Sequence, residues 1–192
     1  MCNFPPVYSI AGDGLANEGI NSTKLGLRGI PDLAEHIQIT RDLFLLEYTG
    51  GKLHIPTIST KKSVALIKEA KKKGLNVTCS VSAHHLTLTD DELINFDAHL
   101  KVTPPLRTKN DCKALIKGVK DGTIDMITSD HNPIDIEHKK VEFSAAKNGT
   151  IGLESLFGAV NSVLSLEDSI SCLTTKPRKR FNIKQPSIAE GH

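Results

Sequence analysis

The sequence predicts an α/β fold in which parallel strands alternate with flanking helices. β-branched runs alternate with amphipathic segments at the spacing of repeated βαβ units, and polar residues such as Thr57, His84 and Asp130 follow the strand-like runs. A chain of 192 residues holds about three or four such units, whereas a closed eight-fold barrel takes ~250 residues. The fold is therefore either an open doubly wound sheet or part of an α/β barrel.

The first long helix is expected between a glycine-rich segment and a Gly-Gly pair. Pro31 suits a first helical turn, and Leu33, Ile37 and Phe44 form an apolar stripe at helical spacing. Gly50 and its neighbour end the pattern. The following helix should turn an apolar face made by Val64, Ile67 and Ala70 inward.

The remaining elements follow from the same rules of periodicity and β-propensity. Strand-like runs cover 52–60, 75–81 and 124–128, and helices are expected at 61–73, 90–96, 109–120 and 152–164.

The balance of positive and negative residues limits the kinds of molecule that the protein is expected to bind. Lys and Arg total 24 against 22 Asp and Glu, a net charge of +2, which predicts no nucleic-acid partner. No apolar run approaches the ~18–20 residues of a membrane-spanning helix, and the first residues lack the regions of a secretion signal. We therefore expect a soluble, cytoplasmic protein with no membrane partner.

Four cysteines, Cys2, Cys79, Cys112 and Cys172, lie far apart with no CxxC spacing. This spacing favours reduced, structural thiols over a disulfide framework or a zinc knuckle.

The end of the chain is rich in Lys and Arg between residues 176 and 184. It could be a nuclear signal or a phosphate-binding patch, but a basic helix end and surface linker is favoured. We therefore expect one barrel-type domain over 1–170 and a basic tail over 171–192.

The segment 121–133 is the strongest candidate for chemistry. Asp130 follows a buried-type strand and precedes a His-Asn-Pro sequence. A carboxylate there could bind a metal and act as a general base, or it could cap the loop while His131 packs. His84 and His85 follow another strand, but adjacent side chains on an extended segment point to opposite faces. A packed or hydrogen-bonded role is therefore favoured for that pair.

Six segments, taken together and in order, resemble those of a known protein family. They cover 17–31, 53–60, 77–86, 101–107, 121–133 and 149–154. In this order they resemble the later part of the dihydroorotases, members of the amidohydrolase superfamily. The resemblance implies a metal-dependent TIM (β/α)₈ barrel that interconverts carbamoyl-aspartate and dihydroorotate in pyrimidine biosynthesis. It also implies that this chain is a partial barrel, roughly the last four βα units, with zinc as the family's metal.

The family's ligands transfer to this chain only in part. Its first-strand His-x-His pair and bridging carboxylate or carboxylated lysine would fall before Met1. Its fifth-strand histidine falls near Phe4, and its sixth-strand histidine falls on Thr57. His54 lies three residues from Thr57, so a regular strand would point it to the opposite face. Asp130 matches the eighth-strand aspartate, which is the family's metal ligand and catalytic base.

The substrate positions are altered too. Thr103 stands where the family has asparagine, Ile134 where it has histidine, and Ile151 where it has proline. Thr103 retains a hydroxyl for hydrogen bonding, and Arg107 and the Gly152 amide would help shape the pocket. Ile134 cannot bind a carboxylate.

Two functions from different classes follow. The chain is part of a dihydroorotase-like enzyme that is not competent alone, or it is a non-catalytic scaffold of the kind that assembles with aspartate transcarbamoylase. A generic small-molecule-binding domain is a third reading. Because a partial barrel leaves strand edges unpaired, we also expect a homo-oligomer.

Overall fold

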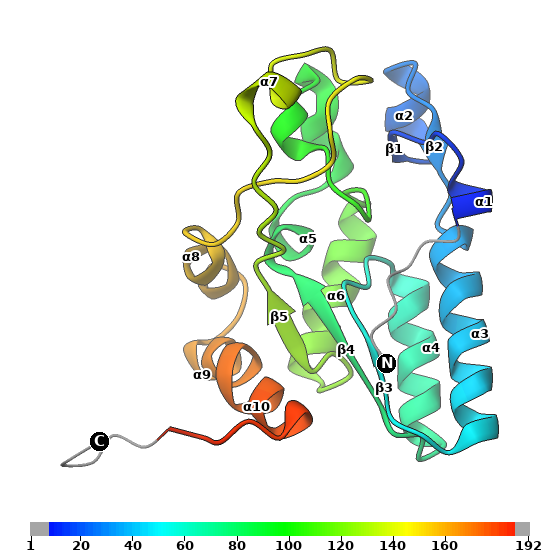
Figure 1. Cartoon of the computed structure of the whole chain (residues 1–192), viewed down its shortest axis with the longest axis vertical. Coiled ribbons are helices and arrows are strands. Elements are labelled where there is room, and N and C mark those ends of the chain that lie inside the picture. The colour runs from blue at the N-terminus through cyan, green and yellow to red at the C-terminus, as the bar shows by residue number, and fades with distance from the viewer. Residues whose placement is uncertain (1–7, 187–192) are drawn as a thin grey trace.

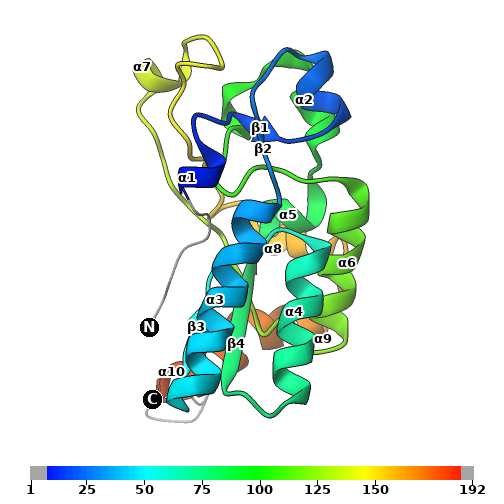
Figure 2. The same ribbon diagram turned by 90° about the vertical axis from the view of Figure 1, so that its right-hand side faces the viewer.

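A computed structural model describes residues 8–186. Three parallel strands form its central sheet in the order β3-β4-β5 (Leu53–Ile55, Val77–Ser82 and Met126–Thr128), and a second parallel pair, β1-β2 (Ala16–Asn17 and Gly29–Ile30), lies apart from it. The longer helices α3 (Leu33–Thr49), α4 (Lys61–Lys72) and α6 (Lys109–Lys120) stand side by side along the sheet (Figure 1, Figure 2). The α/β class with parallel strands and flanking helices is confirmed.

Shorter elements fill the connections between these strands and helices. They are α1 (Tyr8–Ala11), α2 (Ile20–Lys24), α5 (Ala83–Thr87), the 3-10 turns η1 (Asp90–Asn95) and η2 (Ala98–Leu100), α7 (Ile136–Lys139), α8 (Leu156–Asn161), α9 (Leu166–Ile170), the π-helical turn η3 (Ser171–Thr175) and α10 (Lys176–Phe181).

The sheet alternates between an apolar and a polar face, as the period of a strand requires. Leu53 and Ile55 of β3 belong to the main apolar core, together with Val77 and Cys79 of β4, which lie opposite them in register. Between them, His54 Nδ1 lies 3.0 Å from Thr78 Oγ1. One face of the sheet therefore packs on apolar side chains, and the other carries polar groups.

Helix α4 forms where its sequence predicts, and its caps explain why. Thr60 accepts a hydrogen bond from the Ser63 amide at the N-terminus. The predicted inward residues Val64, Ile67 and Ala70 are all buried in the main core.

Helix α3 forms too, but its predicted apolar stripe faces outward. Leu33, Ile37 and Phe44 are exposed, whereas Ile39 and Leu43 pack into the core. The helix carries apolar residues on two faces, and helical period alone does not say which face the sheet covers. The helix expected at 152–164 forms only over the shorter range of α8, which begins at Leu156 and ends at Asn161.

The basic end of the chain is a helix held against the sheet. Cys172 belongs to the main core, and Arg180 Nη2 donates to the carbonyl of Leu53 at 2.6 Å. The ring of Phe181 lies edge-on to His54, with 5.4 Å between centroids. Residues 171–181 thus pack on the same body, and the boundary at 170 stays a prediction.

Within residues 8–186, no helix is both long and apolar enough to cross a membrane. The cysteines among these residues, Cys79, Cys112 and Cys172, are free and buried, as expected for structural thiols. Cys2 lies outside the described residues.

Candidate functional site

Three sequence-predicted positions follow the carboxyl ends of the three parallel strands. Thr57 comes after β3, His84 after β4 and Asp130 after β5. Because β3, β4 and β5 pair in parallel, these residues lie at the same edge of the sheet. This is the edge at which α/β proteins place ligands and catalytic groups.

His84 and Asp130 lie close together there, with 3.7 Å between Nε2 and Oδ2. The His84 side chain is only 9% exposed, and neither of its ring nitrogens has a hydrogen-bond partner within the described residues. Burial lowers the pKa of His84 to about 3, and burial also raises the pKa of Asp130 above its ordinary value. The pair therefore combines a neutral imidazole with a partly buried carboxyl group.

His85 differs sharply from its neighbour. Its Nε2 donates to the carbonyls of Pro104 and Pro105, at 3.1 and 3.2 Å, and its Nδ1 accepts from the Ser82 hydroxyl. The expectation that the two rings point to opposite faces is wrong, because both residues lie in helix α5 and their centroids are 4.6 Å apart. His85 has the hydrogen-bonded role expected for the pair, and His84 does not.

The backbone is strained at two of these positions. Thr57 has φ 49° and Asp130 has φ 47°, both in the left-handed region. That conformation is unusual for any residue except glycine and is an outlier for a β-branched residue. Such strain is concentrated at functional sites. Both strained positions lie two residues after a strand of the central sheet, at the edge where the candidate site is located.

A cavity of about 260 Å³ opens beside His84. Its walls come from α5, from η2 and the loop after it, from the loop after β5, and from α8 with the loop that precedes it. The lining residues are Ala83, His84, Thr87, Leu88, His99, Leu100, Val102, Leu106, Ser129, Thr150, Ile151, Gly152, Ser155 and Ala159.

Gly152, predicted to shape the pocket, lies in this wall. A Cβ at this position would come 2.3 Å from the carbonyl oxygen of Ser129, so only glycine fits. The Gly152 amide donates to His131 Nδ1 at 3.3 Å, as does the Leu153 amide. His131 therefore holds the loop that closes this side of the cavity.

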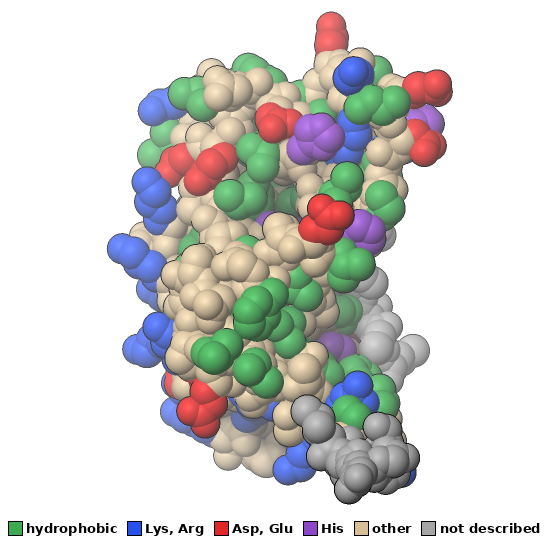
Figure 3. Space-filling view, turned by 90° about the vertical axis from the view of Figure 1, so that its left-hand side faces the viewer, with side chains coloured by type: hydrophobic (Ala, Val, Ile, Leu, Met, Phe, Trp, Pro, Cys, Tyr) green, Lys and Arg blue, Asp and Glu red, His purple; other side chains and the backbone are tan. Residues whose placement is uncertain are grey.

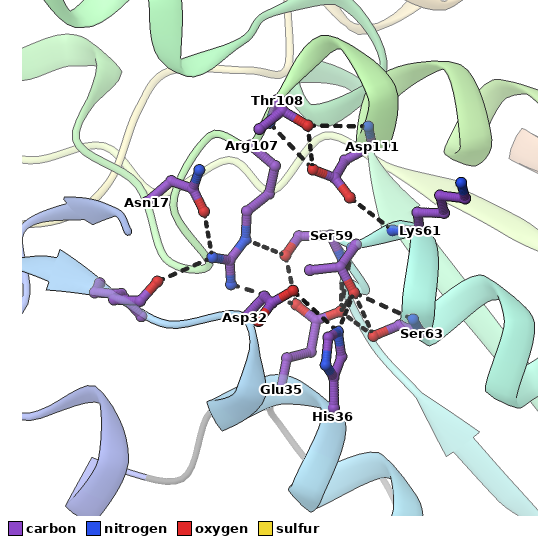
Figure 4. Close-up of polar contacts among 12 residues, drawn as sticks. Asn17, Asp32, Glu35, His36, Ser59, Lys61, Ser63, Arg107, Thr108 and Asp111 are labelled. Carbon is purple, nitrogen blue, oxygen red and sulfur yellow. Dashed lines mark hydrogen bonds and ion pairs between the residues drawn. The ribbon is translucent and has the colours of Figure 1, made fainter. Parts of the chain in front are cut away.

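Arg107 lies in a buried network outside the cavity lining (Figure 4). Its guanidinium donates to Asn17 Oδ1 at 2.8 Å and to the Ile30 carbonyl at 3.1 Å, and its Nε donates to Ser59 Oγ at 3.0 Å. Glu35, 1% exposed, lies 3.9 Å from it.

Glu35 in turn ties the end of β3 to the start of α3. It accepts hydrogen bonds from the hydroxyl groups of Ser59 and Ser63 and from the Ser59 amide. Three of the six family-like segments (17–31, 53–60 and 101–107) thus contribute to one network. No sequence pattern distinguishes Glu35 as a buried group, because an acidic residue in a first helical turn is ordinary.

The other predicted site residues within 8–186 do not line the cavity. Thr103 is half-buried and leads into the loop whose carbonyls bind His85. His54 lies in the middle of β3, one residue before the strand ends, and is hydrogen-bonded to Thr78. Phe4 lies outside the described residues. The substrate-binding roles of Thr103, Arg107 and Gly152 stay predictions.

The described residues do not form a complete zinc site. No group of three or more His, Cys, Asp and Glu side chains converges among residues 8–186, whereas zinc takes three or four protein ligands. Asp130 and His84 offer two donors, and Thr57 supplies no nitrogen. Any further ligands would have to come from other residues.

The two buried histidines should make the fold sensitive to acid. The pKa of His84 falls to about 3 and that of His85 to about 4, both mainly through burial. The unfolded chain takes up protons near pH 6.5 while the folded chain does not, so stability should be lost as the pH falls below 6.5.

Urea unfolding at pH 7.5, 6.0 and 5.0 measures this slope. His84→Leu should flatten it, and His138→Leu, which changes a half-buried histidine of α7, should leave it unchanged. An identical slope in wild type and His84→Leu would contradict the assignment of His84 as a buried neutral imidazole.

No protein-family model matches the chain. A dihydroorotase from Thermoanaerobacter sp. (strain X514) is 43% identical over 192 residues, which cover 95% of this chain and 44% of that protein. A dihydroorotase from Carboxydothermus hydrogenoformans is 44% identical over 199 residues, covering all of this chain and 46% of the relative. The L-hydantoinase (dihydropyrimidinase) from Arthrobacter aurescens matches with a TM-score of 0.75 at 29% identity, over 81% of this chain and 36% of that structure.

The chain spans less than half the length of these relatives. The similarity nevertheless runs through nearly all of its own length, and the segments with which it resembles them meet in one folded body, at the Arg107 network and the strand ends. The chain is therefore homologous to the dihydroorotases, over a stretch that is less than half of their length.

Proposed function

We propose that this chain supplies the last four βα units of a barrel-type cyclic amidohydrolase, with dihydroorotate and carbamoyl-aspartate as its substrates. The observation that carries the proposal is the pair formed by Asp130 and His84 at the carboxyl edge of a parallel sheet, in a chain homologous to the dihydroorotases. Catalysis requires the rest of the barrel.

Asp130 is the group suited to proton transfer. Its carboxylate would take a proton from the water that attacks the ring carbonyl and return it to the ring nitrogen as the C–N bond breaks. Burial raises its pKa toward the working pH, which favours both accepting and releasing the proton. No step is assigned to zinc, because its ligands would have to include residues beyond those described.

Two exposed apolar surfaces support an incomplete barrel. One is the outer stripe of α3, where Phe44 and Tyr48 are exposed. The other lies on the opposite flank, where Phe157, Leu166 and Ile170 of α8 and α9 are exposed, and hydrophobic side chains gather on that face (Figure 3). β3 and β5 are the outer strands of the sheet formed by the described residues. Further βα units would cover these edges.

A scaffold role is the second candidate, and Thr57 favours it. A hydroxyl residue at a position that resembles a family ligand weakens any metal site, while the Arg107 network and the fold are intact. In this reading the chain assembles with a partner such as aspartate transcarbamoylase.

Dihydroorotate hydrolysis by the purified chain in zinc-supplemented buffer tests the first proposal. The chain alone should be inactive. It should become active when expressed together with the part of the Thermoanaerobacter relative that precedes the matched region, and Asp130→Ala in that complex should abolish the activity. A well-folded complex without activity would favour the scaffold.

Light scattering tests the incomplete barrel independently of chemistry. The chain alone should form dimers or larger assemblies, because unpaired strand edges and two apolar flanks associate. A stable, monodisperse monomer would count against this account.

A further inference from the structure

We propose that the chain carries a second binding site, for a small soluble molecule that bears a diphosphate or phosphate group, between α10 and the amino ends of β3, β4 and β5. Because these strands are parallel, this is the opposite edge of the sheet from the one that holds Thr57, His84 and Asp130. The site is therefore separate from the candidate functional site. The inference does not depend on the proposed function.

The site is a pocket of about 410 Å³, within the ~300–1,000 Å³ of small-molecule sites. It lies at the end of the molecule where α10 packs, away from α5 (Figure 1, Figure 2). Its walls come from the residue before β3, from the starts of β4 and β5, and from α10 with the residue after it. The lining residues are Lys52, Thr78, Asp125, Met126, Lys176, Lys179, Arg180 and Asn182.

Half of these lining side chains are cationic. Lys52, Lys176, Lys179 and Arg180 form no ion pair with a carboxylate among residues 8–186. The whole chain has a net charge of only +2, so four cations without counter-charges around one pocket are a local concentration of positive charge. Lysine and arginine are the side chains that bind phosphate groups in proteins.

The carboxylate in the lining is already compensated. Both oxygens of Asp125 accept from Lys71 Nζ at 2.8 Å, and one also accepts from the Cys79 amide at 2.9 Å. Lys71 does not line the pocket. An anion in the pocket would therefore meet the four cations without facing a negative group that lacks a partner.

Two of the cations are held in place by uncharged groups. Arg180 Nη2 donates to the carbonyls of Leu53 and Asn76, at 2.6 and 3.2 Å, and Lys176 Nζ lies 3.3 Å from Cys172 Sγ. Burial raises the pKa of the Cys172 thiol, which keeps it uncharged. These contacts fix the positions of the two cations without neutralising them, so part of the cost of ordering a binding site is already met.

The dipole of a helix does not by itself explain the cluster. Lys179 and Arg180 lie in the last turn of α10, where cations are favoured. Lys52 belongs to no helix, yet it lines the same pocket from the start of β3. Four cations around one pocket suit an anion that carries several negative charges, as a diphosphate does, better than a single carboxylate.

Calorimetry of the full chain with inorganic pyrophosphate at neutral pH tests the site. Pyrophosphate should bind at one site per chain and raise the melting temperature until the site is saturated. The double variant Lys52→Gln with Lys179→Gln should weaken binding by about tenfold or more, because a hydrogen bond to a charged group contributes at least that factor. Both side chains are exposed, so the fold should be kept.

A second double variant separates the pocket from the overall charge. Lys62→Gln with Lys113→Gln removes the same charge from exposed lysines in the first turns of α4 and α6, and it should leave the affinity nearly unchanged. Equal weakening in the two double variants would overturn the proposal, because pyrophosphate would then follow net charge alone. Absence of saturable binding, or unchanged affinity in the Lys52 and Lys179 variant, would overturn it too.

Two competitors check that the ligand is small and soluble. A single-stranded DNA oligonucleotide and vesicles containing phosphatidic acid should each bind more weakly than pyrophosphate, because a pocket admits a small anion more readily than a polymer or a membrane surface. Tighter binding of either, lost in the Lys52 and Lys179 variant, would overturn the assignment to a small ligand.

Discussion

Arg107→Met should lower the free energy of unfolding by about 3–5 kcal/mol, the cost of breaking a buried ion pair by removing one partner. The substitution leaves Glu35, 1% exposed, without its cation, and removes the donor that binds Asn17 and the Ile30 carbonyl. The segments around Asn17, Ile30 and Ser59 would lose the guanidinium group that all of them contact. Urea unfolding monitored by circular dichroism measures the loss.

An exposed pair supplies the matched control. Arg28 contacts Asp13 at 2.9 Å, with side chains 67% and 93% exposed, and Arg28→Met should cost less than ~1 kcal/mol. The double variant Arg107→Met with Glu35→Gln should recover part of the loss, because it removes the orphaned charge. A cost at Arg107 as small as that at Arg28 would show that the network does not hold these segments together.

The sequence predicts an element best where its local pattern agrees with the way the element packs in the fold. Helix α6 runs from Lys109 to Lys120, as predicted, because Thr108 and Asp111 form a capping box at its start. The α4 prediction succeeded for the same reason. The predicted ends of β4 and β5 agree with the structure to within one residue, whereas the run expected to reach residue 60 is a strand only as far as Ile55.

Predictions from local sequence patterns are wrong where the burial of a residue depends on elements far away in the chain. The outward stripe of α3 is apolar, and only the position of the sheet decides that Ile39 rather than Phe44 is buried. A stripe of this kind is explained if further βα units cover it, which no local pattern can reveal.

The residues of the candidate site also depend on contacts that local sequence patterns do not predict. The sequence predicts Asp130 at a strand end, but it favours a packed or hydrogen-bonded role for His84, because it indicates an extended segment where α5 forms. Arg107 was expected at the pocket, and its contacts with Asn17 and Ser59 come from residues 90 and 48 positions away. Such partners are visible only once the chain has folded.

Asp130→Asn should lower kcat of the completed barrel by ~10²–10⁴-fold, the usual contribution of a general base. The same variant should make the chain more stable at neutral pH. Burial raises the pKa of Asp130 in the folded chain above its ordinary value of 3.8, so the folded state holds the proton more tightly than the unfolded state. Stability is therefore lost as the pH rises from 3.8 through the folded pKa, and asparagine carries no such penalty.

The stabilisation by Asp130→Asn should accordingly be present at pH 7 and shrink as the pH falls toward 3.8. Asp135→Asn is the matched control, because Asp135 lies in the same loop with its side chain 88% exposed, and it should change neither kcat nor stability. A structural capping role for Asp130 predicts the opposite sign, since removal of a useful carboxylate would destabilise the chain at pH 7. Loss of activity together with a gain in stability is the combination expected of a carboxylate kept at a strained, partly buried position for catalysis.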